Sequence, residues 1–156
     1  MSDTIIVAPH PDDEIIGCYE ILITTNPIII YDGDTSKERR EPILKLNEYT
    51  DLKVQLFQKT IPQPMLNKTN TFYLPDPIYE LHPLHRQWGF LGEQLARAGF
   101  DIVFYNTNMN APYIHECVPS IDKEEMLNNV YPDQSSLWKY DKKYVLFEGR
   151  CKWLFT

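Results

Sequence analysis

Five consecutive residues near the start of the chain, His10-Pro11-Asp12-Asp13-Glu14, place an imidazole beside three carboxylates. Imidazole nitrogen and carboxylate oxygen are both good zinc ligands. His10 and Asp13 are three residues apart, so at a turn from strand to helix both can face one metal ion. Asp12 would then lie close to the metal without binding it, where its carboxylate can take a proton from a water that the metal activates. The segment predicts a metal site with its own general base.

A second segment, His82-Pro83-Leu84-His85, carries two more histidines. Two histidines three residues apart can converge on one site, so that one binds the metal while the other handles charge on a substrate. His115, the remaining histidine, falls in a polar stretch, and either a pocket-lining role or a solvated role is open for it.

Each segment also has an ordinary interpretation. An acidic cluster after a strand is commonly a solvated helix start, because carboxylates favour the positive end of the helix dipole. A lone His-x-x-His in a loop is commonly incidental. The combination favours a metal site, because three of the four histidines lie in two clusters, each at the end of an expected strand.

The elements that must position these residues follow an alternating pattern. Residues 4–8 form a short β-branched run typical of a buried strand in a parallel sheet, and Pro9 ends it. Further strands are expected at 27–31, 71–74, 101–105 and 144–147, and helices at 14–24, 36–57, 86–98 and 122–130. Loops are expected at 60–70, 82–85 and 106–119, with a turn at Asp32-Gly33-Asp34. The apolar end, Cys151–Thr156, is expected to dock or to form an oligomer contact. Strands alternating with helices predict an α/β fold with a mainly parallel sheet, and ligands bind such sheets at the carboxyl ends of the strands.

The first motif has a recognisable pattern. Ala8-Pro9-His10-Pro11-Asp12-Asp13-Glu14, followed by Gly17-Cys18, resembles the opening motif of the PIG-L/LmbE-like deacetylases. Three later stretches fit in the same order, the last of them loosely: Asp32-Gly33-Asp34 with Arg39-Arg40-Glu41, then His82-Pro83-Leu84-His85-Arg86, then Lys123 through Tyr131 to Gln134-Ser135. The resemblance implies a Rossmann-like three-layer α/β sandwich over a single domain, residues 1–156. It also implies a zinc-dependent hydrolase that removes acetyl groups from N-acetylglucosamine-type sugars and related amides.

The resemblance also implies a role for each matching position. His10, Asp13 and His85 would bind zinc, although such a ligand set also accepts Fe(II), Co(II) or Mn(II). Asp12 would be the general base, and His82 would stabilise the oxyanion or give a proton to the leaving amine. Arg39 or Arg40 would contact the substrate, and the spacing to Glu41 leaves that choice open.

Three features depart from the family pattern. Leu84 replaces an acidic residue inside the second motif, and that residue often supports the neighbouring histidine. The chain is short for the family, so the substrate pocket could be open or completed by another subunit. Gln134-Ser135 reverses the Ser-Gln order of the family's late motif.

These departures support an alternative hypothesis, a binding or scaffold protein with weakened catalysis. Another alternative keeps the metal and changes the bond that is hydrolysed.

Composition limits the partners and the location. The net charge of −7 over 156 residues argues against nucleic acid as a partner. Three cysteines without a CxxC pair favour reduced thiols in the cytoplasm. The N-terminal residues do not have the pattern of a signal peptide. The sequence also has no run of about 18 apolar residues, so no membrane span is expected. The partners expected are a small molecule or sugar and, at the apolar end, a second copy of the chain.

Overall fold

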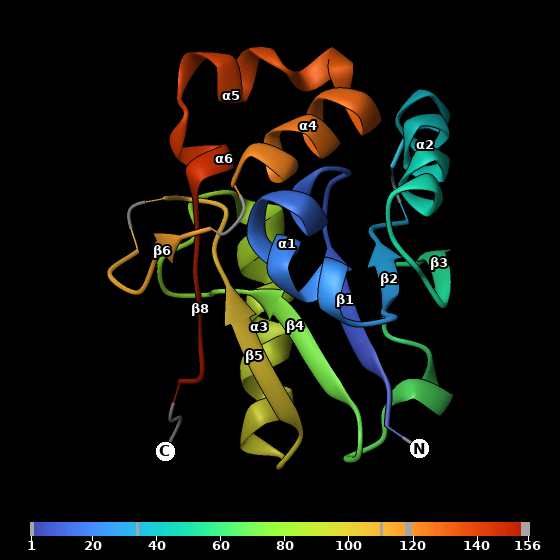
Figure 1. Cartoon of the computed structure of the whole chain (residues 1–156). Coiled ribbons are helices and arrows are strands. Elements are labelled where there is room, and N and C mark those ends of the chain that lie inside the picture. Colours follow the sequence, from blue (N-terminus) through green and yellow to red (C-terminus); the bar gives the residue numbers. More distant parts are fainter. Residues whose placement is uncertain (1, 34, 110, 118–119, 154–156) are drawn as a thin grey trace.

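The computed structural model describes residues 2–33, 35–109, 111–117 and 120–153. Its main sheet has six strands in the order β3-β2-β1-β4-β5-β8 (Figure 1). Their bounds are β1 Thr4–Ala8, β2 Ile28–Tyr31, β3 Val54–Phe57, β4 Thr71–Pro75, β5 Asp101–Tyr105 and β8 Arg150–Cys151. Strands β1 to β5 pair in parallel, and β8 pairs antiparallel to β5. The chain runs outward from β1 to β3 and returns to place β4 on the other side of β1, so the strand order reverses between β1 and β4.

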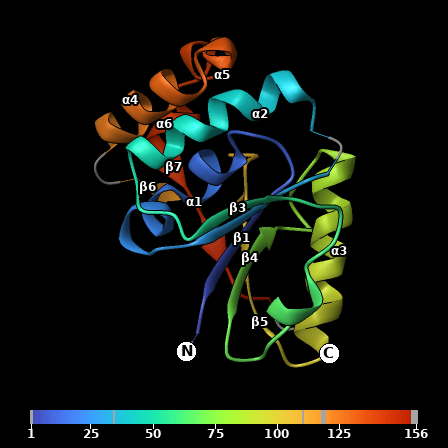
Figure 2. The same ribbon diagram turned by 90° about the vertical axis from the view of Figure 1, so that its right-hand side faces the viewer.

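Helices cover both faces of this sheet. Their bounds are α1 Asp13–Thr24, α2 Lys37–Ile43, α3 Pro83–Arg97, α4 Ser120–Val130, α5 Ser136–Tyr140 and α6 Lys143–Leu146. Figure 2 shows α3 on one side of the sheet and α1, α2 and α4 on the other. Short 3-10 turns lie at Leu44–Glu48 (η1), Gln63–Met65 (η2) and Pro132–Gln134 (η3), and β6 (His115–Glu116) pairs with β7 (Phe147–Glu148).

Alternation along the central strands divides the core in two. Side chains of successive strand residues point to opposite faces of a sheet. Ile6 and Ala8 of β1 pack in the cluster with α1 and the C-terminal helices, whereas Ile5 and Val7 pack with α3. All four are fully buried. The continuous apolar run that predicted a buried parallel strand is thus explained by helices on both faces.

Two glycines let helices approach the sheet closely. A Cβ at Gly89 of α3 would lie 2.7 Å from the carbonyl oxygen of Pro75. A Cβ at Gly17 of α1 would lie 2.2 Å from a ring carbon of Tyr105. Because both helices carry residues of the candidate site, these contacts fix where those residues lie.

The predicted α/β class with a mainly parallel sheet is confirmed, and the layered arrangement is consistent with a Rossmann-like layout. The single helix predicted over 36–57 is wrong. Helix α2 ends at Ile43, one residue after Pro42, and the chain tightens into η1. Residues 54–57 instead form β3, which pairs with β2 in a register that sets Ile28 opposite Val54. Sheet pairing overrides the imperfect helical spacing of the leucines.

Two further boundaries are corrected. The helix predicted from 86 begins at Pro83, because proline is well accommodated in the first helical position and His82 caps the end. The strand predicted at 144–147 is mostly helix α6, followed by β7. Parts of three predicted segments lie outside the described residues. These are Asp34 of the predicted turn, residues 110 and 118–119 of the predicted loop, and residues 154–156 of the apolar end. Within the described part of the chain, no helix is long and apolar enough to span a membrane.

Candidate metal centre

The turn that joins β1 to α1 carries His10, Asp12 and Asp13. Asp12 adopts a left-handed backbone conformation with φ of 103°, which is strained for a residue other than glycine and is common at functional sites. The backbone N–H of His10 donates to Asp13 Oδ2 over 2.8 Å, and the Asp13 N–H donates back to the His10 carbonyl. This reciprocal bonding closes the turn, so that His10 and Asp13 face the same point.

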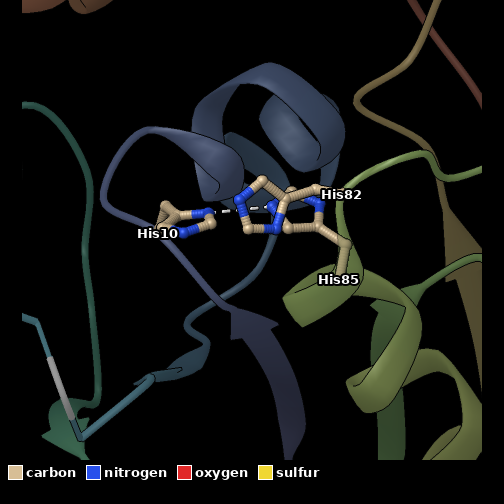
Figure 3. A group of neighbouring side chains, drawn as sticks. All are labelled: His10, His82 and His85. Carbon is tan, nitrogen blue, oxygen red and sulfur yellow. Dashed lines mark hydrogen bonds between the residues drawn. The ribbon is translucent and has the colours of Figure 1, made fainter.

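The start of α3 brings the other two histidines to that point. Parallel strands β1 and β4 are neighbours, so their carboxyl ends meet at one edge of the sheet, where the strand order reverses and ligands commonly bind. His82 is the N-cap of α3, and its Nδ1 accepts the backbone N–H of Leu84 over 3.1 Å. His85 lies within the first turn and is buried. Figure 3 shows the rings of His10, His82 and His85 gathered together.

Three atoms lie at spacings that suit one metal ion. His85 Nε2 is 3.0 Å from His10 Nδ1 and 3.0 Å from Asp13 Oδ2, and the last two atoms are 3.6 Å apart. In a tetrahedral zinc site with bonds of about 2.1 Å, ligand atoms are separated by roughly 3.4 Å. The donor set His10, Asp13 and His85 therefore fits a zinc-type ion by chemistry and by spacing.

His82 provides a second way to complete the centre. Ligand atoms of His10, His82 and His85 lie within 4.8 Å of one another, so the three histidines also form a candidate ligand group. The His82 ring centroid is 4.6 Å from that of His10, and the side chain is exposed. Because its Nδ1 accepts a backbone N–H, neutral His82 carries its proton on Nε2. His82 can thus donate a hydrogen bond at the edge of the centre.

A carboxylate and a hydroxyl support His85 from behind, and sequence reasoning missed both. Glu80 is 2% exposed, and its Oε1 lies 3.4 Å from His85 Nδ1. Thr107 donates its backbone N–H to Glu80 over 2.7 Å, and its hydroxyl lies 3.3 Å from His85 Nδ1. Such partners hold a metal-binding imidazole in the tautomer that leaves Nε2 free for the metal. The only local signal was an acidic residue two positions before His82.

The electrostatics of this centre favour positive charge. Burial opposes protonation of His85, but Asp13 and Glu80 outweigh it and raise the pKa of His85 to about 10. Burial likewise opposes ionisation of Asp13, but His85 and hydrogen bonds from His10 and His85 hold the pKa of Asp13 well below its usual value. The carboxylates that stabilise a protonated imidazole here would also stabilise a bound cation.

Asp12 has the opposite environment. Its side chain is buried, and this burial, together with neighbouring Asp13 and Glu14, raises the pKa of Asp12 well above its usual value, while Arg39 opposes the rise. A raised pKa makes a carboxylate a stronger base. Glu14 is also buried and accepts the Tyr131 hydroxyl over 2.5 Å, so it ties α1 to the residue that follows α4.

The structure separates the two arginines that the sequence left equivalent. Arg39 Nη2 donates to the Pro11 carbonyl over 3.2 Å, and Arg39 lines a pocket of about 280 Å³ that also includes His10. Arg40 donates to the carbonyls of Thr35 and Gly33, and its guanidinium lies 4.5 Å from the centre of the Phe57 ring. Arg39 therefore belongs to the candidate site, and Arg40 braces the chain between β2 and α2.

Two other residues singled out from the sequence lie in a separate network. His115 is exposed, and its Nε2 pairs with Glu20 over 2.8 Å. Lys123 is fully buried and donates to the carbonyls of Ile16 and Phe147. Ile16 lies just before Cys18, where α1 is kinked. Both residues tie elements together, and Cys18 is fully buried.

Comparisons of the chain with protein-family models, curated proteins and solved structures found no match. The deacetylase resemblance therefore stays a prediction from the motifs.

Proposed function

We propose that the chain is a zinc-dependent hydrolase that removes an N-acetyl group from an amino sugar or a related small-molecule or glycoconjugate amide. The observation that carries this proposal is the convergence of His10 Nδ1, Asp13 Oδ2 and His85 Nε2 within 3.0–3.6 Å. Asp12, a buried carboxylate with a raised pKa, directly precedes one of these ligands. A metal ion and an adjacent base are the two parts that metal-assisted amide hydrolysis requires.

The residues of the chain divide the chemistry between them. A zinc ion held by His10, Asp13 and His85 would polarise the amide carbonyl and make a water molecule easier to deprotonate. Asp12 takes the proton from that water as the water attacks the carbonyl carbon, and its raised pKa suits it to this role. Asp12 then returns this proton to the leaving nitrogen as the C–N bond breaks, and the products are acetate and a free amine.

His82 serves the developing oxyanion. Its Nε2–H is free to donate because its Nδ1 is engaged by the Leu84 backbone N–H. Burial and the two neighbouring histidines lower the pKa of His82, which favours the neutral donor. A donor aimed at the charge that forms in the transition state is among the largest contributions to such catalysis.

A binding or scaffold role with weakened catalysis is the second candidate, and Leu84 favours it. Leu84 occupies the position at which the PIG-L/LmbE-like family has an acidic residue. Within the described residues, the hydrogen bond shown for the His82 side chain is the one that its Nδ1 accepts from the Leu84 backbone N–H. Without an acidic partner, His82 would be less firmly oriented as a hydrogen-bond donor to the oxyanion. The two candidates differ in turnover, because both retain the three ligands.

Metal content tests the proposal first. We expect about one equivalent of zinc in the purified protein, lost in both His10→Ala and His85→Ala, with Arg40→Gln as a control that retains the metal. Acetate release from a panel of N-acetylated amino sugars would then distinguish the hydrolase from the binding protein. A wild-type protein that stays metal-free with zinc supplied would overturn the proposal, and zinc binding without any acetate release would favour the second candidate.

A further inference from the structure

We infer that the site accepts acyl groups longer than acetyl, with the acyl chain lying in a groove along α3 against a wall of apolar side chains. This inference rests on the proposed amide hydrolysis and names the substrate class more narrowly. Its basis is a pocket of about 260 Å³ beside the metal centre, lined by Asp32, Lys59, Leu84, Gln87, Trp88 and Leu91.

The groove shares two lining residues with the pocket that includes His10. The pocket of about 280 Å³ that includes His10 is also lined by Asp32 and Leu84. Asp32 follows β2 and Leu84 lies in the first turn of α3, so the two pockets share residues from two different elements. A substrate with its carbonyl at His10 can therefore extend past Leu84 into the groove.

One wall of the groove is an apolar stripe. Leu84, Trp88 and Leu91 are separated by four and three residues, which places them on one face of α3. The stripe begins at the leucine that lies between the two histidines of the second motif. Leu84, which replaces the acidic residue of the family motif, would thus be the first apolar side chain that an acyl chain contacts beyond the scissile carbonyl.

The carboxylate of Asp32, which also lines the groove, already has protein partners. Trp88 Nε1 donates to Asp32 Oδ2 over 3.2 Å, and Lys59 Nζ lies 3.5 Å from Asp32 Oδ1. Asp32 is 4% exposed. Its charge is therefore balanced by protein groups and does not require a polar ligand in the groove.

A second pocket, which adjoins the His10 pocket at Arg39, suits the amine portion of the substrate. Arg39 is shared between the His10 pocket and a larger pocket of about 520 Å³. Charged and amide side chains contribute much of that larger lining, namely Glu38, Arg39, Lys45, Asp133 and Gln134. The Arg39 guanidinium at one end and the stripe of Leu84, Trp88 and Leu91 at the other would orient the amide, with its amine portion towards Arg39 and its acyl chain towards Leu91.

The test is a chain-length series. With zinc-loaded protein and N-acetyl-, N-butyryl-, N-hexanoyl- and N-octanoylglucosamine, we expect kcat/KM to rise about fourfold per buried methylene until the groove is filled. Leu91→Trp should fill the groove and remove the preference for long chains while hydrolysis of the acetyl substrate persists. Phe90→Trp is the matched control, since Phe90 is half exposed on the same helix and lines neither pocket.

A binding measurement tests whether an acyl chain enters the groove, independently of amide hydrolysis. Octanamide should shift the indole N–H resonance of Trp88, assigned with Trp88→Phe, in the wild type and in Phe90→Trp but not in Leu91→Trp. A preference for acetyl, or an octanamide titration without a Trp88 shift, would overturn this inference and leave the proposed deacetylation standing. A protein that binds no zinc and hydrolyses none of the four amides would overturn the proposed function together with the inference.

Discussion

At the residue scale, adjacent carboxylates carry opposite electrostatic environments. The pKa of Asp12 is raised by burial and by its acidic neighbours, whereas His85 and the surrounding hydrogen bonds lower that of Asp13. Neighbouring groups whose environments drive their pKa values apart commonly divide the roles of base and ligand. Asp13 is therefore suited to bind a cation and Asp12 to accept a proton.

This division predicts different outcomes for two isosteric variants. Asp13→Asn should lose zinc, because it removes the charged oxygen 3.0 Å from His85 Nε2. Asp12→Asn should retain zinc and lose about a hundredfold to ten-thousandfold in turnover, the usual contribution of a general base. Metal analysis and acetate release on the same preparations would check both. Equal loss of zinc in the two variants would contradict the assignment.

Glu80 offers a second prediction at this scale. Glu80→Gln removes the carboxylate that faces His85 Nδ1, so we expect zinc affinity to fall about 10- to 100-fold, as is typical for an outer partner of a metal-binding histidine. A competitive chelator titration measures this change. Glu93→Gln, which breaks a surface pair with Arg97, should leave the affinity unchanged, and an equal effect of both variants would exclude a positioning role for Glu80.

At the element scale, the position of α3 decides whether the second motif reaches the first. Gly89 allows α3 to approach the end of β4, because a Cβ there would lie 2.7 Å from the Pro75 carbonyl oxygen and 2.8 Å from the Pro77 nitrogen. Both are backbone atoms, which cannot rotate away as a side chain can. The helix can accept a larger residue only by moving away from the strand end.

Gly89→Ala is therefore expected to destabilise the fold by about 1–3 kcal/mol, although alanine is the better helix former. It should also weaken zinc binding, because His85 lies one turn earlier on the displaced helix. Urea unfolding and a zinc titration measure the two effects. Gln94→Ala, at an exposed position of α3, is the control, and a Gly89→Ala protein as stable as this control would show that the helix is not held as closely as described.

At the scale of the whole molecule, a charged network joins the start and the end of the chain. Glu20 of α1 pairs with His115 of β6 and with Arg150 of β8, each over 2.8 Å. Arg150 also pairs with Glu148 of β7. Partial burial opposes ionisation of Glu20, but hydrogen bonding with Glu148, Arg150 and His115 lowers its pKa from 4.5 to about 2.

A lowered pKa in the fold predicts how this network responds to acid. Ionised Glu20 stabilises the fold above pH 4.5, and its contribution is lost as the pH falls from about 4.5 towards 2. Because the side chain is partly exposed, the contribution is at most about 1 kcal/mol. Urea unfolding of metal-free wild type and Glu20→Gln should therefore differ at pH 6 and converge near pH 2. A constant difference across that range would show that the ionisation of Glu20 contributes nothing.

The sequence by itself determined the local part of this site. The apolar run of β1, the proline that ends it and the acidic start of α1 are neighbours in the chain, so their geometry follows from local propensity. That was sufficient to predict His10 and Asp13 on one turn, and the α/β class with a parallel sheet. The spacing of His82 and His85 indicated a site, although their place at the start of α3 was missed.

Only the tertiary structure decided the contacts between distant segments. The reversal of strand order between β1 and β4 brings His85 to within 3.0 Å of His10. The same packing selects Arg39 over Arg40 and places Glu80 behind His85. It also pairs residues 54–57 with β2, where helical spacing had favoured a helix. These contacts depend on burial and on pairing across the sheet, and neither is encoded in the spacing of residues along a single segment.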